Sequence, residues 1–191
     1  MKQVYINKIE YFLPSLKESN SSVLKLSGRN KADIKKMIDK IGVKTRRIAN
    51  KNIFSNDLAI GSAKKIFKFI NSKEIDYLIY CTNTPDYLLP TNACLLQDKL
   101  GLKKTIGAFD VILACSGYIY SLSIAKSLIL AGQAKNVLLI TSDTYSKFIK
   151  KNTPKTRILF GDGSTSTLIS AKKKVNSFKI NNFAYGTDGS G

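Results

Sequence analysis

Short apolar segments alternate with helix-like segments along the first 142 residues, and this alternation restricts the possible folds more than any other feature. Strand-like runs rich in β-branched and aromatic residues are followed by stretches with apolar residues three and four positions apart. The strand-like runs cover 4–13, 75–82, 106–113 and 137–142, and the helical stretches cover 31–41, 56–70, 92–100 and 116–131. Such alternation predicts an α/β fold with a mostly parallel sheet.

The last third of the chain has no helix-like stretch between its strands. Segments 158–160 and 166–170 flank the turn Gly161-Asp162-Gly163, and 178–185 forms a last apolar run. These segments predict a strand pair and an antiparallel edge to the sheet. The polar segment 15–27 is expected to be a loop. We find no repeat and no linker, so residues 1–191 are expected to form one domain.

The segment 116–131 is almost entirely apolar or small, with Lys126 as its single charge. A helix on the outside of a sheet normally carries a polar stripe, so this helix should be buried on both sides. One sheet covers only one of those sides. We therefore expect a second domain or a second chain on the face of this helix that points away from the sheet. The sequence is expected to represent half of a larger protein assembly.

Composition excludes several kinds of chemistry. The 191 residues include no histidine, so neither a Ser-His-Asp triad nor a histidine-ligated metal site can be completed within the chain. The 31 basic and 13 acidic residues give a net charge of +18, which attracts anionic partners. The lysines are scattered and outnumber the arginines 27 to 4, and no nucleic-acid motif is present, so a nucleic-acid binder is disfavoured.

The three cysteines are too few and wrongly spaced for a disulfide framework or a zinc ribbon. The start of the chain lacks a signal-peptide core, and no apolar run approaches the ~18 residues of a membrane span. We expect a cytoplasmic protein without a metal site, and we assign Cys81 and Cys94 to packing.

Cys115 lies between the strand-like run and the apolar helix, followed by Ser116 and Gly117. A thiol at a helix N-terminus faces unpaired N–H groups, which favour the thiolate and can stabilise an oxyanion. The competing interpretation is a small buried hydrophobic residue, the commonest role of a free cysteine. Position alone does not separate a nucleophile from a packing residue.

Six blocks resemble β-ketoacyl-acyl-carrier-protein synthase III of the thiolase-like superfamily, and they occur in the family's order. They are GVKTRRIA (42–49), CTNTPDYLLPTNACLLQDKLGL (81–102), FDVILACSGYIYSL (109–122), LLITSDTYSK (138–147), ILFGDGSTSTLIS (158–170) and GTDGSG (186–191). The resemblance covers nearly the whole chain. It implies the N-terminal half of a thiolase-like fold: a five-stranded mixed sheet with helices on both faces, whose active-site helix is covered by a second half.

The resemblance also implies a reaction. Cys115 would take an acyl group from acyl-CoA, and the acyl-enzyme would condense with malonyl-carrier protein, with loss of carbon dioxide, to a 3-oxoacyl product. No separate cofactor is needed, and the partners would be acyl-CoA, an acidic acyl carrier protein and a second copy of the chain. The family's triad adds a histidine and an asparagine from the second half of the fold, and this chain contains no histidine.

Other site positions are carried over from the family's motifs. Leu89 matches a residue that reaches the partner subunit's acyl pocket, Arg46 and Arg47 fall in the segment associated with the CoA nucleotide, and Arg157 would contact a phosphate. A structural role beside the site is expected for Gly117, Gly161, Asp162, Gly163 and Gly189. The chain departs from the family in having no tryptophan for CoA and, in Leu89, a smaller residue than the usual aromatic.

Two alternatives to the enzyme remain open. The chain could be a non-catalytic thiolase-like subunit or a truncated remnant that acts by binding or dimerisation, an interpretation favoured by the missing histidine. A basic nucleic-acid binder is supported by charge alone.

Overall fold

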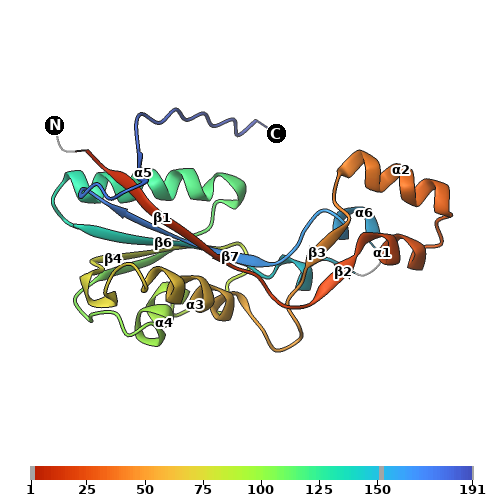
Figure 1. Ribbon diagram of the computed structural model, residues 1–191, viewed down its shortest axis with the longest axis horizontal. Helices are drawn as coiled ribbons and strands as arrows, with labels where there is room; N and C mark the ends of the chain where they lie inside the picture. The colour runs from red at the N-terminus through yellow and green to blue at the C-terminus, as the bar shows by residue number, and fades with distance from the viewer. Residues whose placement is uncertain (1–2, 151–152, 191) are drawn as a thin grey trace.

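The computed structural model describes residues 3–150 and 153–190. One mixed sheet of six strands forms its centre, in the order β5-β4-β6-β7-β1-β8 (Figure 1). The strands are β1 (Tyr5–Phe12), β4 (Tyr77–Cys81), β5 (Gly107–Val111), β6 (Asn136–Asp143), β7 (Gly163–Ser170) and β8 (Phe178–Lys179). The sheet therefore has one strand more than the five that the sequence predicts.

The strand directions follow the prediction of a mixed sheet. Strand β4 pairs in parallel with β5 and β6, whereas β7 is antiparallel to both β6 and β1. The predicted strand pair around residues 161–163 is wrong. Residues 158–160 form no strand, because Ile158 ends the short helix α6 (Pro154–Arg157) and is fully buried there.

Helices cover both faces of the sheet. Helices α3 (Ser55–Ile66) and α4 (Asn92–Lys99) lie on one face, and α5 (Gly117–Leu130) lies on the other (Figure 1). Each face has its own apolar core. The first core combines Ala63, Ile66 and Leu96 with Leu78 and Leu138 of the strands. The second combines residues of α5 with the opposite side of the same strands, namely Leu122, Ala125, Ile129, Ile79, Val137 and Leu139.

A small lobe extends from one end of the sheet (Figure 1). It consists of α1 (Asn20–Leu26), α2 (Lys31–Ile41), α6 and the two-stranded sheet of β2 (Lys17–Ser19) and β3 (Thr45–Arg47). Asn30 caps α2 by accepting a hydrogen bond from the Asp33 amide, and Gly42 ends it in the left-handed conformation. The expectation of a loop over 15–27 is wrong, since this segment contains β2 and α1.

The outer face of α5 is only partly covered. Ile119 and Leu130 are exposed, whereas the ring of Tyr120 packs on Tyr185 with centroids 4.9 Å apart. Lys126 Nζ donates to the Asn181 carbonyl at 2.8 Å. The segment after β8 thus crosses α5 as coil (Figure 1), instead of continuing the strand predicted over 178–185. None of the described helices has the length and apolarity to cross a membrane.

The connections complete the element list. The part of the chain that the structure describes contains three single turns of 3-10 helix: η1 (Ser72–Glu74), η2 (Ala114–Ser116) and η3 (Tyr145–Lys147). The turn η2 joins β5 to α5, so it lies at the edge where the parallel strands β4, β5 and β6 end. Ligand sites in α/β sheets form at this edge, and η2 lies there.

Candidate functional site

Cys115 lies at the centre of η2, with its side chain exposed. The residue before it, Ala114, has φ +45°, a left-handed conformation that costs an alanine about 1 kcal/mol or more. A sharp turn of this kind between a strand and a helix presents the middle residue to solvent. The prediction that the cysteine lies at the head of α5 therefore agrees with its observed position.

A hydrogen-bond network from neighbouring strand ends supports this turn. Asn83 Oδ1 accepts from the Ala114 amide at 2.9 Å. The backbone amide of Asn83 in turn donates to Asp143 Oδ1 at 2.8 Å. The same carboxylate oxygen accepts from Thr82 Oγ1 at 3.2 Å and from Thr84 Oγ1 at 2.9 Å. The conformation of the cysteine turn thus depends on residues just after β4 and on the last residue of β6.

The turn opens onto a pocket of about 440 Å³. Cys115 and Ala114 line it together with the polar residues Asn83, Tyr118, Thr141, Asp143 and Thr165. Cys81 also lines it, yet Cys81 is 5% exposed, and burial together with the negative charge of Asp143 raises the pKa of its thiol to about 11. Of these two cysteines, Cys115 alone is accessible, as a nucleophile must be.

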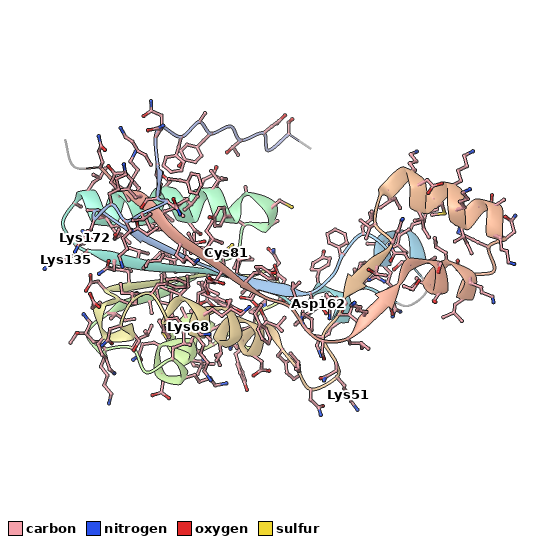
Figure 2. The ribbon with its side chains drawn as sticks, in the orientation of Figure 1. Lys51, Lys68, Cys81, Lys135, Asp162 and Lys172 are labelled. Carbon is pink, nitrogen blue, oxygen red and sulfur yellow. The ribbon has the colours of Figure 1, made fainter. Side chains whose placement is uncertain are left out.

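Gly117 allows α5 to approach β4 closely beside this pocket. A Cβ at Gly117 would lie 2.5 Å from Cys81 Sγ, closer than real Cβ atoms approach other atoms. The packing assigned to Cys81 agrees with this contact, which Figure 2 places in the middle of the molecule. Cys94 differs from the prediction, because its side chain is exposed on α4.

The loop between β4 and α4 carries Leu89. Asp86 accepts from the Ser55 and Asn56 amides of α3, and Asp110 accepts from the Asn92 and Ala93 amides of α4. Between these anchors Leu88 and Leu89 are 85% and 84% exposed. Leu89 therefore points away from its own core, as a residue that contacts a partner would.

Arg46 is not available in the way that the resemblance implies. It is buried, and its guanidinium donates to Asn20 Oδ1, to the Phe160 carbonyl and to Glu18. Arg157 binds the same Glu18 through two hydrogen bonds. We correct the prediction for Arg46, because its guanidinium holds the small lobe together, while Arg157 keeps a partly exposed side chain.

The Gly161-Asp162-Gly163 segment connects the lobe to the sheet and makes no hairpin. The buried Asp162 carboxylate accepts from the Ala49 amide and from both the amide and hydroxyl of Ser146. The Asp162 amide donates to the Arg47 carbonyl, and a Cβ at Gly161 would lie 2.9 Å from that oxygen. Figure 2 places Asp162 between sheet and lobe, so its observed role is structural.

The remaining predicted residues are Arg47, Gly163 and Gly189. Arg47 donates to the carbonyls of Pro14 and Ser15. A Cβ at Gly163 would lie 2.9 Å from Leu13 Cδ2, and one at Gly189 would meet nothing within 4 Å. Gly189 belongs to an exposed coil, and the structure does not bring it to Cys115 by any described contact.

Sequence reasoning missed Asn83, Asp143 and the two threonines of the network. Their signal was their position, because polar residues directly after buried parallel strands meet at one sheet edge. No group of three or more potential ligands for a metal ion occurs in residues 3–150 and 153–190.

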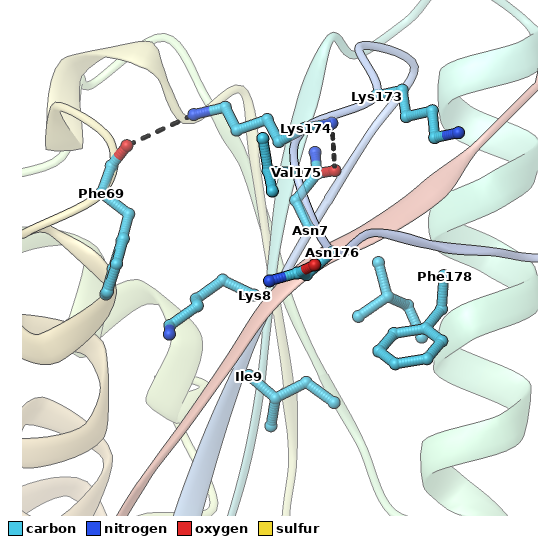
Figure 3. Close-up of a pocket in the computed structure, with 10 residues that line it drawn as sticks. Asn7, Lys8, Ile9, Phe69, Lys173, Lys174, Val175, Asn176 and Phe178 are labelled. Carbon is cyan, nitrogen blue, oxygen red and sulfur yellow. Dashed lines mark hydrogen bonds between the residues drawn. The ribbon is translucent and has the colours of Figure 1, made fainter.

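A second pocket, of about 810 Å³, lies beside β1 and the turn that joins β7 to β8 (Figure 3). Its lining includes Lys8, Lys173 and Lys174, with Phe69 and Phe178. Tyr5 and Asn136, the first residues of β1 and β6, both pair with Ser170 at the end of β7. The turn after Ser170 is therefore at the sheet edge opposite Cys115, and this pocket is no part of the cysteine site.

Comparison with known proteins agrees with this geometry. The sequence profile described as 3-oxoacyl-[acyl-carrier-protein (ACP)] synthase III matches residues 109–189. The β-ketoacyl-[acyl-carrier-protein] synthase III of Chlamydia muridarum is 36% identical, covering 83% of this chain and 51% of that protein. That of Aliarcobacter butzleri is 40% identical, covering 73% of this chain and 45% of that protein.

Solved structures give the same answer. A crystal structure of 3-oxoacyl-(acyl-carrier-protein) synthase III superposes with a TM-score of 0.88 at 40% identity, covering 98% of this chain and 55% of that one. The synthase of Burkholderia xenovorans LB400 superposes with a TM-score of 0.84 at 31% identity, covering 92% and 50%. The chain thus spans about half the length of the relatives it matches.

The mixed sheet, the helices on both faces and the cysteine turn at the head of α5 define a thiolase-like α/β domain. The chain belongs to the 3-oxoacyl-[acyl-carrier-protein] synthase III family, and its match is the one expected for the N-terminal half of a member.

Proposed function

We propose that this chain supplies the acyl-accepting half of a 3-oxoacyl-acyl-carrier-protein synthase III. The observation that supports this most is the exposed Cys115 on a left-handed turn at the head of α5, facing a mostly apolar pocket that several polar residues also line. The thiolate attacks the thioester carbonyl of an acyl-CoA, a carbon–sulfur bond forms to Cys115, and the bond to CoA breaks. Free CoA leaves as a thiol after taking up the proton lost by Cys115.

The helix head contributes electrostatics to this step. The first turn of an α-helix leaves N–H groups unpaired and carries the positive end of the helix dipole. Both features favour the negative charge that develops on the attacked carbonyl oxygen beside the helix. The apolar helix α5 therefore acts as more than packing in this proposal, because its N-terminus stabilises the charge that moves during acyl transfer.

The second step is the decarboxylative condensation with malonyl-carrier protein. The family resemblance assigns a histidine and an asparagine to it, and the 191 residues of this chain include no histidine. We propose that this chain carries the nucleophile and that the decarboxylating groups come from residues outside the sequence.

The test is intact-protein mass spectrometry after incubation with acyl-CoAs of increasing chain length. We expect an acyl adduct on the wild-type chain and none on Cys115→Ser, while Cys94→Ser keeps the adduct. Cys94 is the matched control, since it is also an exposed thiol at a helix. An adduct that survives Cys115→Ser, or no adduct with any donor, would refute acyl acceptance by this chain.

The second outcome would favour the alternative function, a non-catalytic subunit. The missing histidine is the specific observation behind it. Such a subunit would act through its exposed apolar residues, which include Ile119 on α5 and the loop residues Leu88 and Leu89.

The same proposal covers location and partners. We propose a cytoplasmic protein that forms a homodimer through the Leu88 and Leu89 loop, to be tested by light scattering with Leu89→Lys as the disrupting variant.

An acidic acyl carrier protein suits the net charge of +18. Its association rate should fall as salt rises from about 50 to 200 mM, and an unchanged rate would remove the electrostatic argument.

A further inference from the structure

Asn83 has no role in the reaction described above, yet its side chain bonds the backbone of the cysteine turn from another strand end, whereas the Ser116 hydroxyl bonds the Leu113 carbonyl from within the turn. Its Oδ1 accepts from the amide of Ala114, the residue directly before Cys115. Ala114 is one of two non-glycine residues with positive φ in the described chain. The hydrogen bond therefore falls on the backbone unit that carries the conformational cost of the turn.

Asn83 is itself held in place. Its backbone amide donates to Asp143 Oδ1, and this oxygen also accepts from the hydroxyls of Thr82 and Thr84. The Thr84 hydroxyl accepts from the Thr144 amide at 2.9 Å, so the ends of β4 and β6 are bonded in both directions. These bonds fix the backbone of Asn83, and with it the point from which its side chain reaches the Ala114 amide.

We infer that Asn83 is a positioning residue for the nucleophile. Its carbonyl oxygen keeps Ala114 in the left-handed conformation, and that conformation presents the Cys115 thiol to the pocket at the head of α5. Asn83 need not touch the acyl donor for this, because it acts through the backbone of Ala114. The inference extends the proposed function, but it concerns the reactivity of Cys115 and is measurable without an acyl donor.

The test uses the three cysteines of the chain as built-in references. Wild type and Asn83→Ala are alkylated with iodoacetamide, and peptide mass spectrometry follows each cysteine separately. Exposed Cys94 reports the general reaction rate, and buried Cys81 reports whether the domain is folded. Loss of one neutral hydrogen bond corresponds to about a fivefold change in an equilibrium constant. We therefore expect the alkylation rate of Cys115, divided by that of Cys94, to fall about fivefold in Asn83→Ala.

A second variant separates positioning from general support of the fold. Ala114→Gly removes the cost of positive φ, because glycine adopts that conformation freely. In an Ala114→Gly background, Asn83→Ala should change the ratio by less than about twofold, a coupling that a double-mutant cycle measures. Asn136→Ala serves as the matched control: it also loses one side-chain hydrogen bond, to the Glu74 carbonyl, but at the opposite sheet edge.

Two results would overturn the inference. One is an unchanged ratio in Asn83→Ala while Cys81 stays unlabelled, and the other is the same fivefold loss in the glycine background. If Asn83→Ala exposes Cys81 by unfolding, Asn83→Ser replaces it, since the shorter hydroxyl does not reach the Ala114 amide. A missing acyl adduct would refute the proposed function and leave these alkylation results unaffected.

Discussion

At the scale of single residues, Gly117 has the most restricted surroundings in the site. Any side chain there would meet Cys81 Sγ, which belongs to β4 and is buried. A sulfur atom enclosed in this way has little room to move, so a substitution must push α5 away from the sheet.

Gly117→Ala should therefore lower the free energy of unfolding by about 1–3 kcal/mol, the usual cost of overpacking. Urea denaturation measures it. Gly186→Ala is the control, because nothing lies within 4 Å of a Cβ at that position. Adding Cys81→Ala should recover part of the loss, and equal stability of Gly117→Ala and Gly186→Ala would contradict this explanation.

At this scale the sequence predicted the place of Cys115 at the head of α5, but it did not predict the burial of Arg46. The position of Cys115 follows from local order alone, strand then helix. The surroundings of Arg46 depend on Glu18, Asn20 and the Phe160 carbonyl, the last of which is 114 residues away in sequence. A single sequence does not reveal such a partner. An arginine that forms structural contacts inside the protein therefore cannot be told from one that binds an anion at the surface.

At the scale of elements, two aspartates fix the helices that flank the Leu89 loop. Asp110 of β5 accepts from the Asn92 amide at 2.8 Å and from the Ala93 amide at 2.7 Å. Each of its oxygens thereby pairs an N–H group that the first turn of α4 would otherwise leave free. The negative charge also lies at the favourable end of the helix dipole.

Asp110→Ala should cost about 1–2 kcal/mol of stability through loss of this cap. The exposed Asp98 near the other end of α4 provides the control, since Asp98→Ala removes a carboxylate of the same helix without removing a cap. Thermal unfolding followed by circular dichroism compares the two variants. An equal or larger loss of stability in Asp98→Ala would contradict capping of α4 by Asp110.

The order of elements from β4 to β6 was predictable because each has a strong apolar pattern. The lobe was not, and α1 shows why. It has seven residues, no side-chain cap and a polar sequence, and a helix of that length is marginal by itself. Its Val23 and Leu24 pack on Ile34 and Ile158, so tertiary contacts stabilise it. The prediction of a strand over 158–160 was wrong for the same reason, because tertiary contacts of Ile158 within the lobe determine the local structure.

At the scale of the whole molecule, the lobe is held by one carboxylate between two guanidinium groups. Burial alone would raise the pKa of Glu18, but the hydrogen bonds and charges of Arg157 and Arg46 together lower it below the usual value. A lowered pKa means that the ionised form stabilises the folded state. This contribution is complete above the unfolded pKa of about 4.3 and is lost as the pH falls through the lower folded value.

Glu18→Gln should lower the free energy of unfolding by about 2 kcal/mol at pH 7, because two buried or half-buried arginines lose their partner. The difference from wild type should shrink as the pH falls below about 4, where Glu18 itself becomes neutral. Urea unfolding at several pH values measures it. Glu10→Gln, from the more exposed pair with Lys8, should have little effect at any pH. A difference independent of pH would contradict the ionic explanation.

The pairing of β1 has a consequence for how the protein is made. Within the described sheet, strand β1 pairs only with β7 and β8, which follow it far along the chain and are synthesised much later. Tyr5 has to wait for Ser170, so the sheet cannot close until β7 has been synthesised, and contacts of such long sequence separation form slowly. Until then β1 and one side of β6 are open edges that attract other strands. The nascent chain therefore needs protection from self-association for as long as β7 is missing.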